Sequence, residues 1–289
     1  MNESSSQDSL ETAAMEEMYI NLLETNNAFT EAGIRAAIAG LGLFPGARVL
    51  DAPCGVGSHA FWIAQAQADT RVVGFDISSK HIARARSMAA GLRLSDCVTF
   101  MQGDITNPDL PDNSFDFVWC CDGLWLGPPE TGCFAEQPYG VLDQFKRILK
   151  PGGKIAILFW SAHRFLPGYP LLEAALNAPS GSNLPWNWMS KPETHALRAL
   201  AWLEQIGCIR LQAHSFCSDF QAPFTRAQEI ALIGTMNMLW NNAKQEIAPE
   251  IWEQYERLTD PAHADFILRQ RGYAGFIVYS MYTGELAPV

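Results

Sequence analysis

The sequence lacks the features that mark several large classes of protein. Its 289 residues carry 20 basic and 31 acidic side chains and a formal net charge of −11, so no basic field is present to neutralise nucleic-acid phosphates. No apolar run approaches the length of a membrane span, and the N-terminus MNESSSQDSLE has no basic segment followed by an apolar one. We therefore expect no nucleic-acid partner, no membrane partner and a cytoplasmic location.

Cysteines at metal-binding or disulfide-forming spacings are also lacking. The seven cysteines are an odd number and include no C-x-x-C pair, which argues against a disulfide framework and against a zinc site. The adjacent Cys120 and Cys121 raise the idea of thiophilic substrates such as arsenite, but no third thiol lies near them in the sequence. We expect no bound metal, and most thiols packed as small apolar groups.

What the chain does have is a large apolar content. Hydrophobic residues make up 48% of it, and 9 Trp and 16 Phe are enough to fill a sizeable core. Residues 1–9 are polar and serine-rich, and we expect them to be a disordered tail. Apolar residues spaced by three and four then predict a helix after residue 10, which the F-P-G at 44–46 ends.

From residue 48 the chain alternates between short apolar runs and helical patterns. This alternation predicts an α/β fold, in which helices cover both faces of a parallel sheet. The predicted strands are 48–52, 71–76, 97–104, 114–123 and 154–160, and the predicted helices are 58–68, 78–92 and about 137–149.

The second half of the chain is less regular. Residues 161–192 contain prolines and glycines and are predicted to be loop-like. A helix at 195–208 and a strand at 209–216 follow. The stretch 222–272 is mostly helical in character, and 274–286 reads as a final strand.

The loop after the first strand, VLDAPCGVGSHA at 49–60, poses a question about its ligand. Its G-V-G-S-H-A fits the glycine pattern of dinucleotide-binding loops, and ligands of parallel sheets bind at these strand ends. Asp51, however, would face a pyrophosphate, and like charges at short range are costly. A ligand with an amino group would be attracted instead.

Two further acids follow the next two strands. Asp76 ends the second strand, where it can accept hydrogen bonds from a ribose diol, and Asp104 ends the third, where it can accept one from an adenine amino group. Acids at three successive strand ends suit an adenosine joined to a positively charged amino-acid tail. They suit a chain of phosphates badly.

Five segments, in this order and at this spacing, resemble the class I methyltransferases that use S-adenosylmethionine. Each segment is weak alone but together they are specific, and the resemblance covers about residues 45–217. The segments are VLDAPCGVG (49–57), VVGFDIS (72–78), MQGDI (101–105), SFDFVWCCDGLWL (114–126) and RILKPGGKIAI (147–157).

This resemblance implies a fold and a division of the chain. The implied fold is α/β, a doubly wound, Rossmann-like sheet of seven mostly parallel strands, with 274–286 as the seventh, antiparallel strand. Residues 45–221 and 273–289 would form the core that binds S-adenosylmethionine. Residues 10–44 would form a helical cap, and residues 222–272 a helical insertion that acts as a substrate lid.

The resemblance also implies cofactor-binding residues. In that family the first acid and the glycines surround the methionine moiety, the second acid holds the ribose and the third motif frames the adenine. Pro53 departs from the family's D-x-G-x-G-x-G, and its fixed φ argues for a stiffer turn. The implied set is Asp51, Pro53, Cys54, Gly55, Gly57, Asp76, Ile77, Asp104, Ile105 and Cys121.

Four residues are candidates for the acceptor side. Asp122 either caps the following helix or points at the substrate. His163, just past the predicted fifth strand, lies where the family's acceptors approach the sulfonium. Tyr19 lies on a helix of the kind that family members fold over the cofactor, and Trp125 could wall an apolar pocket.

The predicted function is transfer of a methyl group from S-adenosylmethionine to a small, largely apolar molecule by in-line displacement. Apolar and aromatic residues in 222–272 favour such an acceptor. No general base stands out, so the accepting atom (N, O, S or C) and the oligomeric state stay open. Two alternatives remain, namely other chemistry with the same cofactor, such as cyclopropane or aminopropyl transfer, and a non-catalytic protein that binds S-adenosylmethionine.

Overall fold

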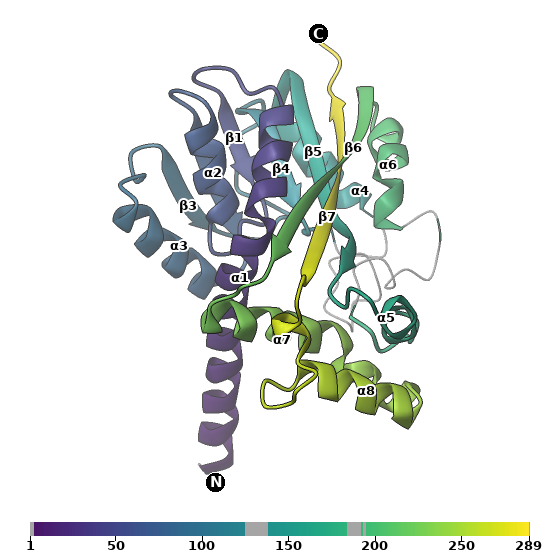
Figure 1. Cartoon of the computed structure of the whole chain (residues 1–289). Helices are drawn as coiled ribbons and strands as arrows, with labels where there is room; N and C mark the ends of the chain where they lie inside the picture. Colours follow the sequence, from purple (N-terminus) through teal and green to yellow (C-terminus); the bar gives the residue numbers. More distant parts are fainter. Residues whose placement is uncertain (1–2, 125–137, 184–191, 193–194, 289) are drawn as a thin grey trace.

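The chain folds around one seven-stranded sheet (Figure 1). The computed structural model describes residues 3–124, 138–183, 192 and 195–288, with the backbone alone at 3–16, 18 and 19. The strands lie in the order β3-β2-β1-β4-β5-β7-β6. Their bounds are β1 Arg48–Asp51, β2 Arg71–Asp76, β3 Val98–Gln102, β4 Phe115–Cys121, β5 Leu149–Arg164, β6 Ile209–Gln221 and β7 Ala274–Glu285.

The pairing of the strands is parallel except at β7. β1 pairs in parallel with β2 and β4, β2 with β3, and β4 with β5. β7 is antiparallel to both β5 and β6. The predicted α/β class, with seven mostly parallel strands and an antiparallel final strand, is confirmed.

Both faces of the sheet are buried under helices. Val49 and Trp119 belong to the apolar core on one face, whereas their neighbours Leu50 and Cys120 belong to the core on the other. The first face is covered by helices α2 Ser58–Ala66 and α3 Ser79–Gly91 and by part of α1 Glu3–Gly40. The second face is covered by helices α4 Tyr139–Ile148 and α6 Ala199–Gln205. Burial on both faces explains why these strands are nearly continuous apolar runs.

Helix α1 begins earlier than the sequence predicted. It runs without interruption from Glu3 to Gly40, so the expected disordered tail over residues 1–9 is wrong for residues 3–9. That stretch contains neither proline nor glycine, so nothing in it stops the helix from extending outward. In Figure 1 this end of α1 projects beyond the rest of the molecule.

The structure also corrects two predictions around β5. The strand predicted at 154–160 begins earlier, at Leu149, because the K-P-G-G at 150–153 forms a bulge inside β5, where the register to β4 shifts and Gly152 has a φ of 76°. The predicted loop at 161–192 in fact begins with the end of β5. It then contains helix α5, Pro170–Asn177, whose first-turn proline is well suited to a helix start.

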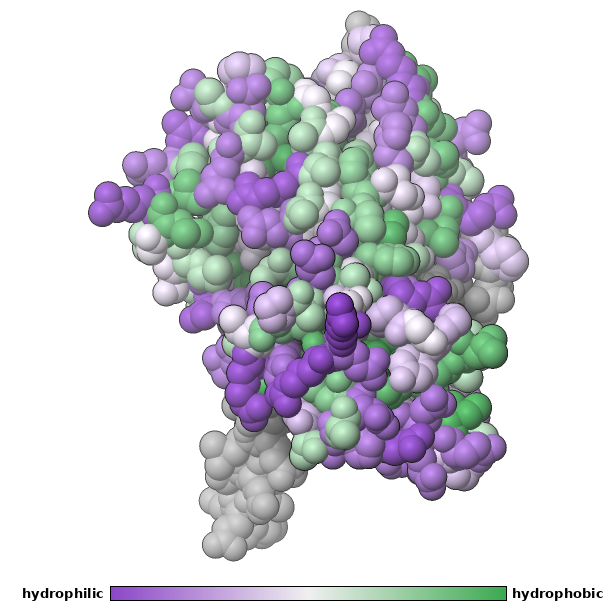
Figure 2. Space-filling view, viewed as in Figure 1, coloured by the Kyte–Doolittle hydropathy of each residue, from purple (hydrophilic) through white to green (hydrophobic). Residues whose placement is uncertain are grey.

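The segment between β6 and β7 carries helices α7 Arg226–Trp240 and α8 Pro249–Thr259. A capping box between Thr225 and Gln228 starts α7. Helix α8 buries Trp252, Tyr255 and Leu258 and turns a mostly hydrophilic surface outward (Figure 2). None of the helices in the described ranges combines the length and the apolar character that a membrane crossing requires.

Candidate functional site

The carboxyl ends of β1, β2 and β4 bring the predicted site residues to one edge of the sheet. Asp51 is the last residue of β1 and pairs with Gly74 of β2 and Trp119 of β4. Asp76 is the last residue of β2, and Cys121 the last of β4. Such an edge is where parallel sheets bind ligands.

Asp51 is fully buried at this edge. Neither of its carboxylate oxygens accepts a hydrogen bond of ordinary geometry from a described residue, although the backbone amide of Ala60 is near enough to oppose the rise in its pKa. Burial raises its pKa well above the ordinary value of 3.8, and the neighbouring charge of Asp76 raises it further. A buried carboxyl without a donor is costly unless a ligand supplies one.

The loop after β1 is fixed by backbone hydrogen bonds. The Cys54 amide donates to the carbonyl of Phe75, and the Gly55 amide donates to Oδ2 of Asp76 at 2.8 Å. Gly57 has a φ of 87°, and a Cβ there would lie 2.6 Å from the ring of Phe100. Gly57 therefore makes room for a side chain of the core, whereas a Cβ on Gly55 would meet no atom closer than 3.9 Å.

Asp76 is well supplied with donors. Its Oδ1 accepts from the Ser78 amide at 2.9 Å and lies 3.3 Å from Nδ1 of His81. These contacts and the one from Gly55 lower its pKa in spite of burial, so the carboxylate is ionised. The next residue, Ile77, is 61% exposed, which is unusual for an isoleucine and leaves an apolar surface beside this acid.

The third acid lies differently. Asp104 is exposed, and its Oδ1 accepts hydrogen bonds from both the amide and the hydroxyl of Thr106, so it holds a turn after β3. Ile105 is 5% exposed and packs into the core under the second face. Asp104 thus lies near the edge of the sheet, but one of its oxygens is engaged in local hydrogen bonds to Thr106.

Asp122 follows β4 and is held from two sides. Its Oδ1 accepts from the backbone amide of Trp160 at 3.0 Å, and its Oδ2 accepts from the hydroxyl of Tyr279 at 2.8 Å. Both carboxyl oxygens are thus engaged by Trp160 and Tyr279, whereas residues 125–137, where a helix for it to cap would lie, are outside the described residues. Burial raises its pKa to about 6, against the lowering effect of these hydrogen bonds.

His163 is not past β5 but inside it, opposite Ile277 of β7. The longer strand explains the difference, since the antiparallel pairing with β7 carries β5 beyond residue 160. Its buried ring lies among Trp160, Phe165 and Trp240, and burial lowers its pKa to about 3. His163 is therefore neutral at physiological pH.

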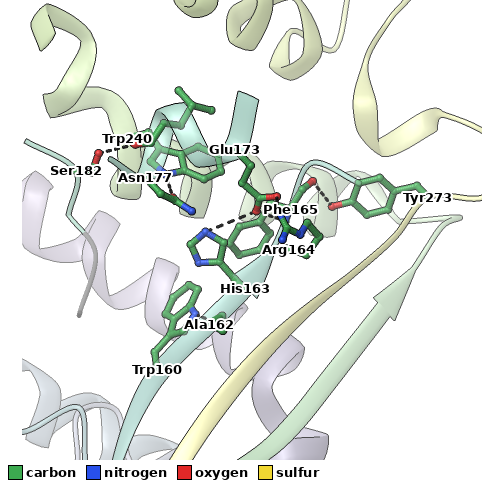
Figure 3. A network of polar contacts seen from close by, with 11 residues as sticks. Trp160, Ala162, His163, Arg164, Phe165, Glu173, Asn177, Ser182, Trp240 and Tyr273 are labelled. Atoms are coloured by element: carbon green, nitrogen blue, oxygen red, sulfur yellow. Dashed lines mark hydrogen bonds and ion pairs between the residues drawn. The ribbon is translucent and has the colours of Figure 1, made fainter. Parts of the chain in front are cut away.

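Around His163 lies a network of buried polar groups (Figure 3). Glu173 of α5 has no exposed surface, lies 3.7 Å from Nε2 of His163, accepts from the Phe165 amide and pairs with Arg164 at 2.8 Å. The indole of Trp240 donates to Oδ1 of Asn177. This network joins α5 and α7 to the end of β5.

Two predicted residues lie outside what the structure describes. Trp125 falls in the undescribed stretch 125–137, and of Tyr19 only the backbone, within α1, is described. Conversely, the sequence did not identify His81 or Tyr279. His81 could have been noticed as a helical neighbour of Asp76, but Tyr279 joins Asp122 only through strand pairing over more than 150 residues, which no local pattern reveals.

The edge fits S-adenosylmethionine in its chemistry. Asp51 offers an unsatisfied buried carboxyl to an ammonium group, and Asp76 is an ionised carboxylate suited to ribose hydroxyls. Ile77 offers an exposed apolar surface to a flat base. A pyrophosphate would meet two acids at the same edge, which is unfavourable.

Comparisons with known proteins agree with this chemistry. Residues 49–153 match a family model described as a methyltransferase domain. Relatives include a sterol 24-C-methyltransferase of Gibberella zeae (35% identity, 42% of this chain, 29% of that one) and phosphoethanolamine N-methyltransferase 3 of Arabidopsis thaliana (37%, 40% and 22%). A third is the 27-O-demethylrifamycin SV methyltransferase of Amycolatopsis mediterranei (36%, 40% and 40%).

These matches are partial, since the chain spans less than half the length of each of these relatives. Two solved structures are similar over most of the chain. The YcgJ protein of Bacillus subtilis has a TM-score of 0.51 at 16% identity and covers 89% of this chain and 99% of its own. The [4+2]-cyclase SpnF has a TM-score of 0.53 at 18% identity, with 94% and 96% covered. At these identities they show the fold.

Proposed function

Residues 49–153 are a class I methyltransferase domain that uses S-adenosylmethionine, and from this premise we propose that the chain transfers a methyl group to a small, largely apolar acceptor. The observation that carries the proposal is Asp51, whose two buried oxygens accept no hydrogen bond of ordinary geometry from the described residues. An ammonium group of the cofactor's amino-acid tail would supply one. When bound, the cofactor supplies an electrophilic methyl group on a sulfonium.

In this proposal the chain's own residues hold and orient the cofactor. Asp51 binds the methionine end, and the loop 53–57 borders it, with Cys54, Gly55 and Cys121 beside it. Asp76 holds the ribose, and Ile77, Asp104 and Ile105 frame the adenine. In-line displacement mainly requires alignment of the reacting atoms and exclusion of water, and fixed residues at strand ends serve the first need.

Helix α1 contributes to the exclusion of water. Leu23 is the side chain nearest to the open space at Gly55, and the Asn27 amide group donates to the hydroxyl of Ser58 at the start of α2. Asn26 is hydrogen-bonded to Thr235 of α7. The helix thus crosses the cofactor loop and contacts the insertion 222–272, and we assign both elements to a lid that excludes water.

The acceptor and the cellular setting belong to the proposal as well. The relatives' names give carbon, nitrogen and oxygen as accepting atoms of those proteins, so a shared domain is compatible with different acceptors. The net charge of −11 supports an acceptor other than nucleic acid. Six described cysteines are free thiols, which supports a reducing, cytoplasmic setting.

Calorimetry with S-adenosylhomocysteine and NAD tests the proposal. We expect S-adenosylhomocysteine to bind and Asp51→Asn to weaken it about 10- to 100-fold, because a charge-assisted hydrogen bond is lost. Asp116→Asn is the control, since Asp116 lies at the opposite end of β4 and contacts Lys150 and Arg48. Binding of NAD without binding of S-adenosylhomocysteine would overturn the proposal.

A further inference from the structure

The carboxyl group of Asp76 receives hydrogen bonds from three different parts of the chain. The amide of Gly55, in the loop after β1, donates to Oδ2. The amide of Ser78, the residue that caps α3, donates to Oδ1. The third contact comes from the first turn of α3, where Nδ1 of His81 lies 3.3 Å from Oδ1. The orientation of this carboxyl group is therefore set both by the cofactor loop and by the start of α3.

The contact between Asp76 and His81 has a definite direction. The two side chains are 7% and 17% exposed, so little water competes for it. Burial alone would raise the pKa of Asp76, but the hydrogen bonds from His81, Ser78 and Gly55 lower it, and the carboxyl group is ionised at physiological pH. An ionised carboxylate only accepts hydrogen bonds, so the proton of this contact lies on Nδ1 of His81.

The backbone of His81 is held by the start of its helix. Its amide donates to Oγ of Ser78 at 3.3 Å, and the amide of Ile82 donates to the carbonyl of Ser78 at 3.1 Å. These bonds belong to the backbone and do not depend on the imidazole ring. A substitution of His81 therefore removes the contact to Asp76 and leaves the cap of α3 in place.

The three donors leave Asp76 little capacity for a ligand. An ionised carboxylate has about four acceptor sites, about two on each oxygen. Ser78 and His81 fill the sites on Oδ1, and Gly55 fills one on Oδ2. Beyond these contacts of the described residues, one site on Oδ2 is left. A ribose presents two neighbouring hydroxyl groups, so Asp76 held in this way accepts a hydrogen bond from only one of them.

We propose that His81 is a positioning residue that makes Asp76 selective for one of the two ribose hydroxyl groups. This inference rests on the proposed function, in which Asp76 holds the ribose. His81 fills the second acceptor site on Oδ1 and fixes the carboxyl group, so that the site left on Oδ2 meets a single hydroxyl. Without the imidazole donor, Oδ1 regains an acceptor site, and the carboxylate can bind both hydroxyl groups.

Calorimetry with S-adenosylhomocysteine and with its 2′-deoxy and 3′-deoxy analogues tests this selectivity. We expect the wild type to bind one of the analogues about tenfold or more weakly than S-adenosylhomocysteine, because a hydrogen bond to a charged group is lost. The other analogue should bind within about threefold of S-adenosylhomocysteine. The ratio of the two analogues' dissociation constants measures the selectivity for one hydroxyl.

His81→Leu and His81→Asn are a matched pair of variants. The two new side chains have similar size and branching, but only the asparagine amide can donate a hydrogen bond near the position of Nδ1. In His81→Leu we expect the ratio to fall to about twofold, since both hydroxyls then share Asp76. In His81→Asn the ratio should stay close to that of the wild type. A merely structural role for His81 would weaken all three ligands by one factor and leave the ratio unchanged.

The outcomes separate the two proposals. If the wild type binds none of the three ligands, the proposed function fails. If it binds them with equal losses for both analogues, or with the same ratio as His81→Leu, the function stands and this inference fails. Loss of the ratio in His81→Asn as well would assign it to packing of the ring and overturn the role of the donor.

His214→Leu is the control for the loss of a histidine. His214 is exposed on β6, which ends the strand order on the side away from β2, and this variant should leave all three affinities unchanged. Thermal melts of each variant identify any loss of folding. The ratio of the two analogues is measured on one protein sample, so a partly unfolded variant changes the number of sites and not the ratio.

Discussion

The carboxyl edge of the sheet is built differently on its two sides. Around β1 and β2, short strands end in acids beside a glycine loop, and backbone amides supply most of the contacts. Around β5 and β7, long strands carry aromatic rings and buried side-chain pairs. The first side, built mainly from backbone groups, is suited to one unchanging ligand. On the second side, built from side chains, a substitution changes the shape of the site.

The acids on the two sides also differ in electrostatics. Hydrogen bonds lower the pKa of Asp76, whereas burial raises the pKa of Asp122 to about 6. Asp76 is therefore a permanent anion, and Asp122 is a group that gains and loses a proton near neutral pH. The charge of Asp76 is thus constant at physiological pH, whereas the charge of Asp122 varies with pH.

Removal of Glu173 should have the largest effect and would show whether the two sides are independent. Glu173→Ala leaves the Phe165 amide without an acceptor and Arg164 without its partner. We expect the free energy of unfolding to fall by about 3 kcal/mol. Urea denaturation measures this loss, and calorimetry should give an unchanged affinity for S-adenosylhomocysteine, since β1 and β2 are untouched.

Glu173→Gln is the matched control for that variant. The amide oxygen can still accept from Phe165, so the expected loss is about 1 kcal/mol. Equal losses in both variants would mean that the charge, and not the acceptor, matters. A parallel fall in cofactor affinity would show that the two sides of the edge are coupled.

The first side of the edge was readable from the sequence because its determinants are local. The segment VLDAPCGVG places an acid, a turn and two glycines within nine residues, and Asp76 follows at the end of the next strand. Strand alternation likewise predicted the sheet correctly. What the sequence could not reveal there was that Gly57 accommodates Phe100, because that contact joins distant segments.

The second side was readable only in part, for a physical reason. Asp122 was a candidate, but its partner Tyr279 is brought to it by the antiparallel pairing of β5 with β7. The same pairing extends β5 to Arg164 and turns His163 from a loop residue into a buried one. Long-range pairing of this kind leaves no periodic signal near the residues concerned.

The contrast between the two acids predicts opposite dependences of stability on pH. The raised pKa of Asp122 means that the folded state binds the proton more tightly than the unfolded state, so this group destabilises the fold as pH rises from about 4 to 6. Replacement by Asn removes that penalty. We therefore compare the free energy of unfolding of Asp122→Asn with that of the wild type. The difference should shift in favour of the variant by about 2 kcal/mol between pH 4.5 and pH 7, as measured by urea denaturation.

Asp76→Asn gives the opposite case. A lowered pKa stabilises the fold above the ordinary value of 3.8, and this stability is lost as pH falls further. The free energy of unfolding of Asp76→Asn should therefore lie below that of the wild type by a constant amount from pH 7 to about pH 4.5, and the difference should shrink below pH 4. Parallel pH profiles for the two variants would contradict the distinction between a fixed and a titrating carboxyl.

The smallest expected effect concerns α1, the element that spans both sides. Glu24 of α1 pairs with Arg84 of α3 beside the cofactor loop, and the side chains are 20% and 46% exposed. Glu24→Gln should lower the free energy of unfolding by less than about 1 kcal/mol, and less still at high salt, because exposed ion pairs are weak and screened. The control is Glu31→Gln, which breaks a pair with Arg35 inside α1 itself. If Glu24 helps to keep α1 over the cofactor loop, Glu24→Gln should weaken the binding of S-adenosylhomocysteine about twofold, and Glu31→Gln should leave it unchanged. Equal affinities in the two variants would mean that only the Asn27–Ser58 and Asn26–Thr235 contacts keep α1 in place.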